Sequence, residues 1–93
     1  MMTHLQRYLK AHEKTLKLAE ASMRKRLATG KPTHMGDIAF DIARATFYET
    51  SEWKARAILS HALHNGAFGD IRAVRGRGIV FIGTAKLSLK RAA

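Results

Sequence analysis

Histidine is the residue type in this sequence that most readily suggests chemistry, because a neutral imidazole binds transition metals and a titrating one moves protons near neutral pH. The chain of 93 residues contains five histidines and no cysteine. His61 and His64 have the i, i+3 spacing that places two side chains on one face of a helix. No third ligand accompanies them, so we predict no metal site. The lack of cysteine excludes disulfides, thiolate zinc sites and cysteine nucleophiles.

Arg56 and His61 form a second arrangement with chemical potential. Their Arg-x4-His spacing is similar to that of HEPN-type ribonucleases, in which an Arg and a His from two protomers together cleave a phosphodiester. Both residue types are common, however, and the strand-like runs further along the chain depart from that all-helical family. Asp37 and Asp41, at i, i+4, are better explained by solvation and charge balance than by acid–base work. Because no Walker loop or nucleophile–base arrangement is present either, we predict no enzyme and no cofactor.

The net charge limits the class of partner. Seventeen Lys and Arg against seven Asp and Glu give +10 with neutral histidines, while 46% of the residues are apolar. That apolar content is enough for one folded domain over 1–93, and the charge attracts polyanions such as DNA, RNA or an anionic membrane face. No apolar run approaches the roughly 18 residues of a membrane span, and the first residues do not resemble a secretory signal. We therefore expect a cytoplasmic protein with no membrane association and no small-molecule substrate.

A single apolar stripe runs through residues 3–29 at helical spacing. Gly30 and Pro32 are typical of a helix end, so the pattern predicts one long helix of about six turns. A core of this size does not need so long a helix, and we expect the stripe to form the seam of a homodimer. The alternative is a long helix packed entirely on its own domain. The expected seam residues are Leu5, Leu9, His12, Leu16 and Met23.

Two shorter helices follow. Residues 35–45 carry apolar side chains at helical spacing, and Ser51 is a favourable N-cap for a third helix from Glu52 to His64. Placed at intervals of about 100°, the residues of this third helix divide into two faces. The face expected to be buried comprises Ala55, Ile58, Leu59, Ala62 and Leu63. The opposite face and its flanks comprise Trp53, Lys54, Arg56, Ala57, Ser60, His61 and His64.

After the third helix the pattern changes to short runs typical of strands. Residues 70–74 alternate polar and apolar, residues 79–82 are β-branched and aromatic, and an Arg-Gly-Arg-Gly link at 75–78 joins them. We expect a β-hairpin with a basic tip, followed by a basic tail over 84–93. The Arg-Gly-Arg core is similar to the centre of an AT-hook without its flanking prolines. The cations expected on the hairpin are Arg72, Arg75 and Arg77.

The order of helix, helix, turn, helix and hairpin resembles the winged helix-turn-helix superfamily of DNA-binding domains. The resemblance covers residues 35–83, with the long helix as the opening element, and implies a mostly α fold with a C-terminal β-hairpin. It implies that the third helix enters the major groove, that the hairpin acts as a wing, and that both contact double-stranded DNA. The expected function is that of a small transcriptional regulator or a plasmid or phage accessory protein, associated with the nucleoid when bound. The alternatives are an RNA-binding module or a protein–protein adaptor that uses the N-terminal helix.

Overall fold

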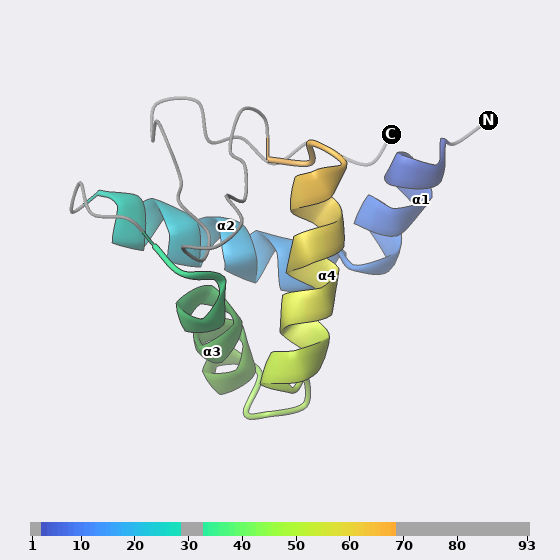
Figure 1. Ribbon diagram of the computed structural model, residues 1–93. Helices are drawn as coiled ribbons and strands as arrows, with labels where there is room; N and C mark the ends of the chain where they lie inside the picture. The colour runs from blue at the N-terminus through green and yellow to red at the C-terminus, as the bar shows by residue number, and fades with distance from the viewer. Residues whose placement is uncertain (1–2, 29–32, 69–93) are drawn as a thin grey trace.

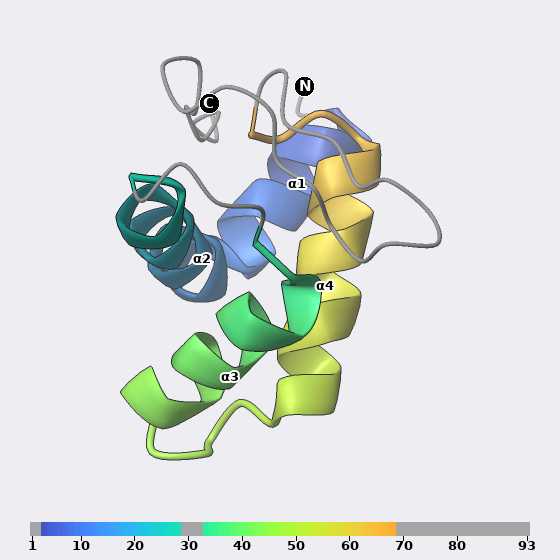
Figure 2. The same ribbon diagram turned by 60° about the vertical axis from the view of Figure 1, so that its left-hand side comes forward.

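The computed structural model describes residues 3–28 and 33–68, which form four helices. They are α1 (His4–Ala11), α2 (Glu13–Leu27), α3 (Met35–Ala45) and α4 (Glu52–His64). Helix α3 packs against both α2 and α4, and α2 also contacts α4 and α1. Figures 1 and 2 show that α3 and α4 are joined at one end by a short connector, at the bottom of both views.

The long helix expected over 3–29 is broken at His12, whose backbone (φ −120°, ψ 25°) leaves the helical region and separates α1 from α2. The break brings α1 beside α4, where the Tyr8 hydroxyl donates a hydrogen bond to the Ile58 carbonyl oxygen at 3.1 Å. Neither glycine nor proline marks the position of this break. The hydrogen bond from Tyr8 to α4 stabilises the bent arrangement relative to a straight helix.

The apolar stripe of α1 and α2 faces the core of its own chain. Leu9, Leu16 and Met23 are 3%, 1% and 0% exposed and belong to one cluster with the buried residues of α3 and α4. Leu5 and His12 are partly buried at the edge of this core. The assignment of Leu9, Leu16 and Met23 to a seam between protomers is therefore corrected, because their own chain already removes them from water. The homodimer itself stays a prediction.

The limits predicted for the third helix are confirmed by α4. The Ser51 hydroxyl accepts a hydrogen bond from the Lys54 backbone N–H at 3.1 Å, as an N-cap residue does. At the other end Asn65 is the C-cap, and Gly66 follows it with a φ of +72°. Helix α3 likewise covers the predicted residues 35–45.

The predicted fold class, however, is contradicted. Residues 3–28 and 33–68 are all helix, turn or coil and contain no strand, so the part of the chain that the structure describes is all-α. The two runs assigned to a hairpin, 70–74 and 79–82, lie outside the described residues, as does the tail 84–93. Alternation over four or five residues is a weak signal for a strand, since strand formation depends on partners that the local pattern does not reveal. No helix among the described residues is long and apolar enough to cross a membrane.

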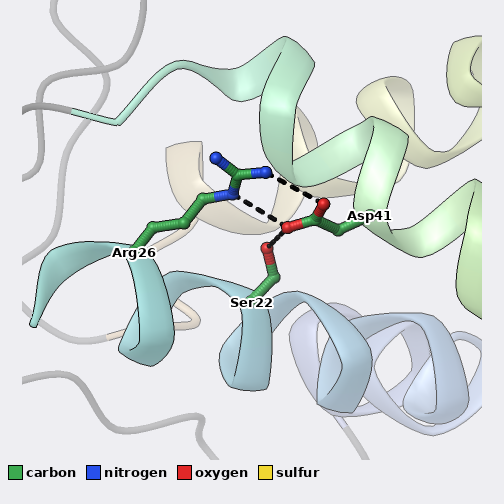
Figure 3. Close-up of polar contacts among 3 residues, drawn as sticks. All are labelled: Ser22, Arg26 and Asp41. Carbon is green, nitrogen blue, oxygen red and sulfur yellow. Dashed lines mark hydrogen bonds and ion pairs between the residues drawn. The ribbon is translucent and has the colours of Figure 1, made fainter.

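A polar clasp attaches α3 to α2 (Figure 3). The carboxylate of Asp41 accepts hydrogen bonds from the Ser22 hydroxyl at 2.7 Å and from two nitrogens of Arg26 at 2.8 and 2.9 Å. The hydrogen bonds from Arg26, more than the one from Ser22, hold the pKa of Asp41 below its usual value. Asp41 is therefore an ionised structural group that fixes α3 on α2. Its charge is balanced by Arg26 in a defined geometry.

Candidate nucleic-acid interface

The two faces predicted for α4 are confirmed in the structure. Ala55, Leu59 and Ala62 are 0% exposed, and Ile58 and Leu63 are 6% and 5% exposed. Because the whole inner face is packed in the core, α4 presents its outer side chains from a rigid support. These outer side chains are all exposed: Trp53, Lys54, Arg56, Ala57, Ser60, His61 and His64.

The outer face of α4 has a positive electrostatic character. After Glu52 in the first turn, α4 contains no carboxylate. Among residues 3–28 and 33–68, the ion pairs involve α2 and α3, and no carboxylate lies within 4.0 Å of the charged nitrogens of Lys54 or Arg56. Both cations therefore keep their charge available for an anionic partner.

A ring cluster borders this face where α1 meets α4. The Tyr8 ring lies 4.6 Å from the His12 ring and 4.3 Å from the His61 ring, measured between centroids. Burial lowers the pKa of His12 most, and the nearby charges of Lys54 and His61 lower it further, which favours the neutral imidazole. Tyr8 thus supports one side of His61 and restricts its position. Tyr8 was not among the residues predicted from the sequence, although its aromatic ring four residues before His12 was an available signal.

The connector between α3 and α4 displays two aromatic side chains in an uncommon backbone conformation. Phe47 and Tyr48 have φ values of +52° and +64°, and they are 91% and 61% exposed. Their backbone N–H groups bond back to the Arg44 and Ala43 carbonyl oxygens at 3.1 and 2.7 Å, which caps the end of α3. A side chain other than glycine in this region costs about 1–2 kcal/mol. The turn is therefore strained at two bulky residues.

Thr46 secures this turn from inside. Its buried hydroxyl lies 3.1 Å from the carbonyl oxygens of Ile42 and Ala43, and it accepts a hydrogen bond from the Thr50 N–H at 3.2 Å. Since the same hydroxyl bonds to both sides of the connector, the exposed aromatic residues project from an ordered turn. No sequence pattern assigned a function to residues 46–50, so this display was not predicted.

A hollow of about 250 Å³ lies between α3 and the first turns of α4, lined by Gly36, Ala39, Glu52, Trp53 and Arg56. Trp53 is 82% exposed and forms an aromatic wall. Gly36 leaves space, because a β-carbon built there would meet no atom within 4 Å. The hollow therefore combines small apolar residues, one aromatic ring, one carboxylate and one guanidinium group. Helical periodicity alone did not reveal it, since its lining comes from two helices.

The structure thus brings together all seven predicted residues of the third helix, whereas Arg72, Arg75 and Arg77 lie outside the described residues. No group of three or more His, Asp or Glu side chains suited to a metal ion occurs within residues 3–28 and 33–68. The chain matches no protein-family model, no curated protein and no solved structure.

Proposed function

We propose that this protein binds double-stranded DNA through the outer face of α4, without covalent chemistry. One observation carries the proposal: this face is exposed along the whole helix, has no acidic residue after Glu52, and bears Lys54 and Arg56 without ion pairs to any described carboxylate. The buried inner face holds it rigid. An extended cationic surface on a helix is the electrostatic footprint of a nucleic-acid-binding protein.

The dimensions and residue types of α4 suit the major groove. An α-helix with its side chains is about 10–12 Å in diameter, and the major groove of B-DNA is about 12 Å wide. In this arrangement Ala57 permits close approach, while the Ser60 hydroxyl and the imidazoles of His61 and His64 hydrogen-bond to base edges. Lys54 and Arg56 neutralise phosphates and set the orientation of the helix on the duplex.

The charge of the rest of the chain supports the same partner. The full sequence carries a net +10, and its segment 71–93 contains six Lys and Arg with no Asp or Glu. Such an excess supplies sequence-independent affinity through counterion release. The role we propose is that of a small transcriptional regulator or a plasmid or phage accessory protein. As a homodimer it would place two α4 helices on half-sites about one helical turn apart.

The test is a salt titration of duplex binding by two charge-matched variants. Lys54→Gln with Arg56→Gln removes two cations from the α4 face, and Lys14→Gln with Lys25→Gln removes two exposed cations from α2. We expect the first pair to weaken binding at least about tenfold and to reduce the salt slope by roughly 0.9 for each lost phosphate contact. The α2 pair should change both quantities much less.

Two results would overturn the proposal. Equal losses in the two variants would mean that only total charge matters and that α4 is no specific surface. Tighter binding of duplex or single-stranded RNA than of duplex DNA, measured in the same titration, would assign the face to an RNA-binding module instead.

A further inference from the structure

We propose that the hollow between α3 and α4 accepts one unpaired base of a DNA duplex, stacked on the ring of Trp53. The inference rests on the proposed DNA binding and deepens it, since the hollow opens beside the same end of α4. Trp53 and Arg56 belong both to the lining of the hollow and to the outer face of α4. A duplex held on that face would therefore lie next to the hollow.

The small and aromatic lining of the hollow suits a flat, mainly apolar group. Gly36 and Ala39 contribute almost no side-chain volume, and the space of about 250 Å³ beside them is bounded by the ring of Trp53. Trp53 is 82% exposed although it is the single tryptophan of the chain, so its ring lacks the cover that such a large apolar group usually has. Stacking on an aromatic side chain tolerates any base, because every base has a π-face.

The polar groups at the rim of the hollow match the edge and backbone of a nucleotide. Glu52 offers a carboxylate that accepts a hydrogen bond from an exocyclic amine, as acidic side chains do from the N4 amine of cytosine. Arg56 offers a guanidinium group for the adjoining phosphate. The hollow should therefore prefer an amine-bearing base such as cytosine to thymine, which has no exocyclic amine.

The surrounding charge selects a polyanion as the occupant. Arg44, Lys54 and Arg56 are exposed on the two helices, and none is within ion-pairing distance of a carboxylate in the part of the chain that the structure describes. A second copy of this chain on this surface would place its own cations next to these, and the like charges would repel. DNA phosphates would instead neutralise them. The connector that leads into α4 adds two further exposed aromatic rings, those of Phe47 and Tyr48.

The experiment uses the intrinsic fluorescence of Trp53, which reports directly on the hollow because the chain has no other tryptophan. The full-length protein is titrated with a fully paired duplex and with the same duplex carrying one extra, extrahelical cytosine or thymine. We expect roughly tenfold tighter binding of the cytosine-bulged duplex than of the paired one, with stronger quenching of Trp53 than the paired duplex produces.

Two leucine substitutions distinguish the effect of filling the hollow from the general effect of adding a leucine side chain to the protein. Gly36→Leu places a side chain in the open space and should abolish the preference for the bulged duplex and the additional quenching that the bulge causes. Ala21→Leu adds the same side chain at an exposed position of α2 and should keep both. The affinity of Gly36→Leu for the paired duplex reports separately on the α4 face.

Each remaining outcome overturns the inference in an identifiable way. Equal affinity for bulged and paired duplexes, or equal quenching of Trp53 by the two, removes the base site and leaves the proposed function standing. Failure to bind either duplex removes both proposals. Equal quenching by cytidine monophosphate alone assigns the hollow to a free nucleotide. Concentration-dependent Trp53 emission without DNA assigns it to a second copy of the chain.

Discussion

Helices α3 and α4 end in similar backbone turns, but the turns are built from opposite kinds of residue. In each, the residue after the C-cap has a positive φ: Phe47 (+52°) after α3 and Gly66 (+72°) after α4. The following N–H, of Tyr48 or Ala67, bonds back to the carbonyl oxygen five residues earlier at 2.7 and 2.9 Å. Glycine adopts this conformation without steric cost, whereas phenylalanine does not.

The two turns also lead the chain into different environments, one buried and one exposed to solvent. After α4 it enters the core, where Ala67 and Phe68 are 0% exposed. At the end of α3 it places Phe47 and Tyr48 in solvent, 91% and 61% exposed. A glycine thus serves the turn that completes the core, and strained aromatic residues occupy the turn beside the proposed DNA-binding surface. Strain kept at an exposed site in this way is typical of functional surfaces.

The largest expected effect on stability tests whether the residues that follow α4 belong to the core and those that follow α3 do not. Phe68→Ala should lower the free energy of unfolding by about 3–5 kcal/mol, because it removes a ring from the core and leaves a cavity. Phe47→Ala should change it by less than about 0.5 kcal/mol, since its ring is solvated. Urea denaturation of the two variants measures both values. Similar losses would show that the turn after α3 is as much a part of the core as the turn after α4.

An intermediate effect should follow from exchanging the residue types at the two turns. Gly66→Ala should cost about 1–2 kcal/mol, because a β-carbon is strained at a φ of +72° even though no neighbouring atom obstructs it. Phe47→Gly should instead raise the stability by about 0.5–1 kcal/mol through relief of strain. Thermal denaturation checks both signs. A loss of stability in Phe47→Gly would show that the ring makes a stabilising contact after all.

The last comparison concerns the Asp41 clasp between α2 and α3. Asp41→Asn should cost about 1 kcal/mol at pH 7, since the ion pair with Arg26 is about one-third exposed on both sides and partly screened by solvent. Asp37→Asn removes the same charge from an exposed position of α3 and serves as the control.

The pH dependence of the clasp has a defined sign. The folded state lowers the pKa of Asp41, so its contribution is complete above the unfolded value of about 3.9 and is lost as the pH falls through the folded pKa. The stability difference between wild type and Asp41→Asn should therefore shrink below about pH 4. A difference that stays constant down to pH 2 would exclude ionised Asp41 as the source of the stabilisation.

Helix α4 is the part of the candidate site that could be predicted from sequence. Ser51 and Asn65-Gly66 set its ends through local hydrogen bonds, and the spacing of its five small and aliphatic core residues determined which side is buried. Such signals act within a few residues and need no knowledge of distant neighbours. The hairpin expectation depended instead on a short alternating pattern, and the all-helical structure of the described residues contradicts the fold class built on it.

The sequence by itself determined the net charge, the range of α3 and α4 and the exposed composition of the α4 face. The tertiary structure alone decided the break at His12, the burial of the α1–α2 stripe in its own chain, the Asp41 clasp and the hollow beside Trp53. The physical reason is the separation along the chain of the residues that interact. Caps and periodicity are set by residues close in the chain, whereas a hollow, a clasp or a bend depends on which distant surfaces are packed together.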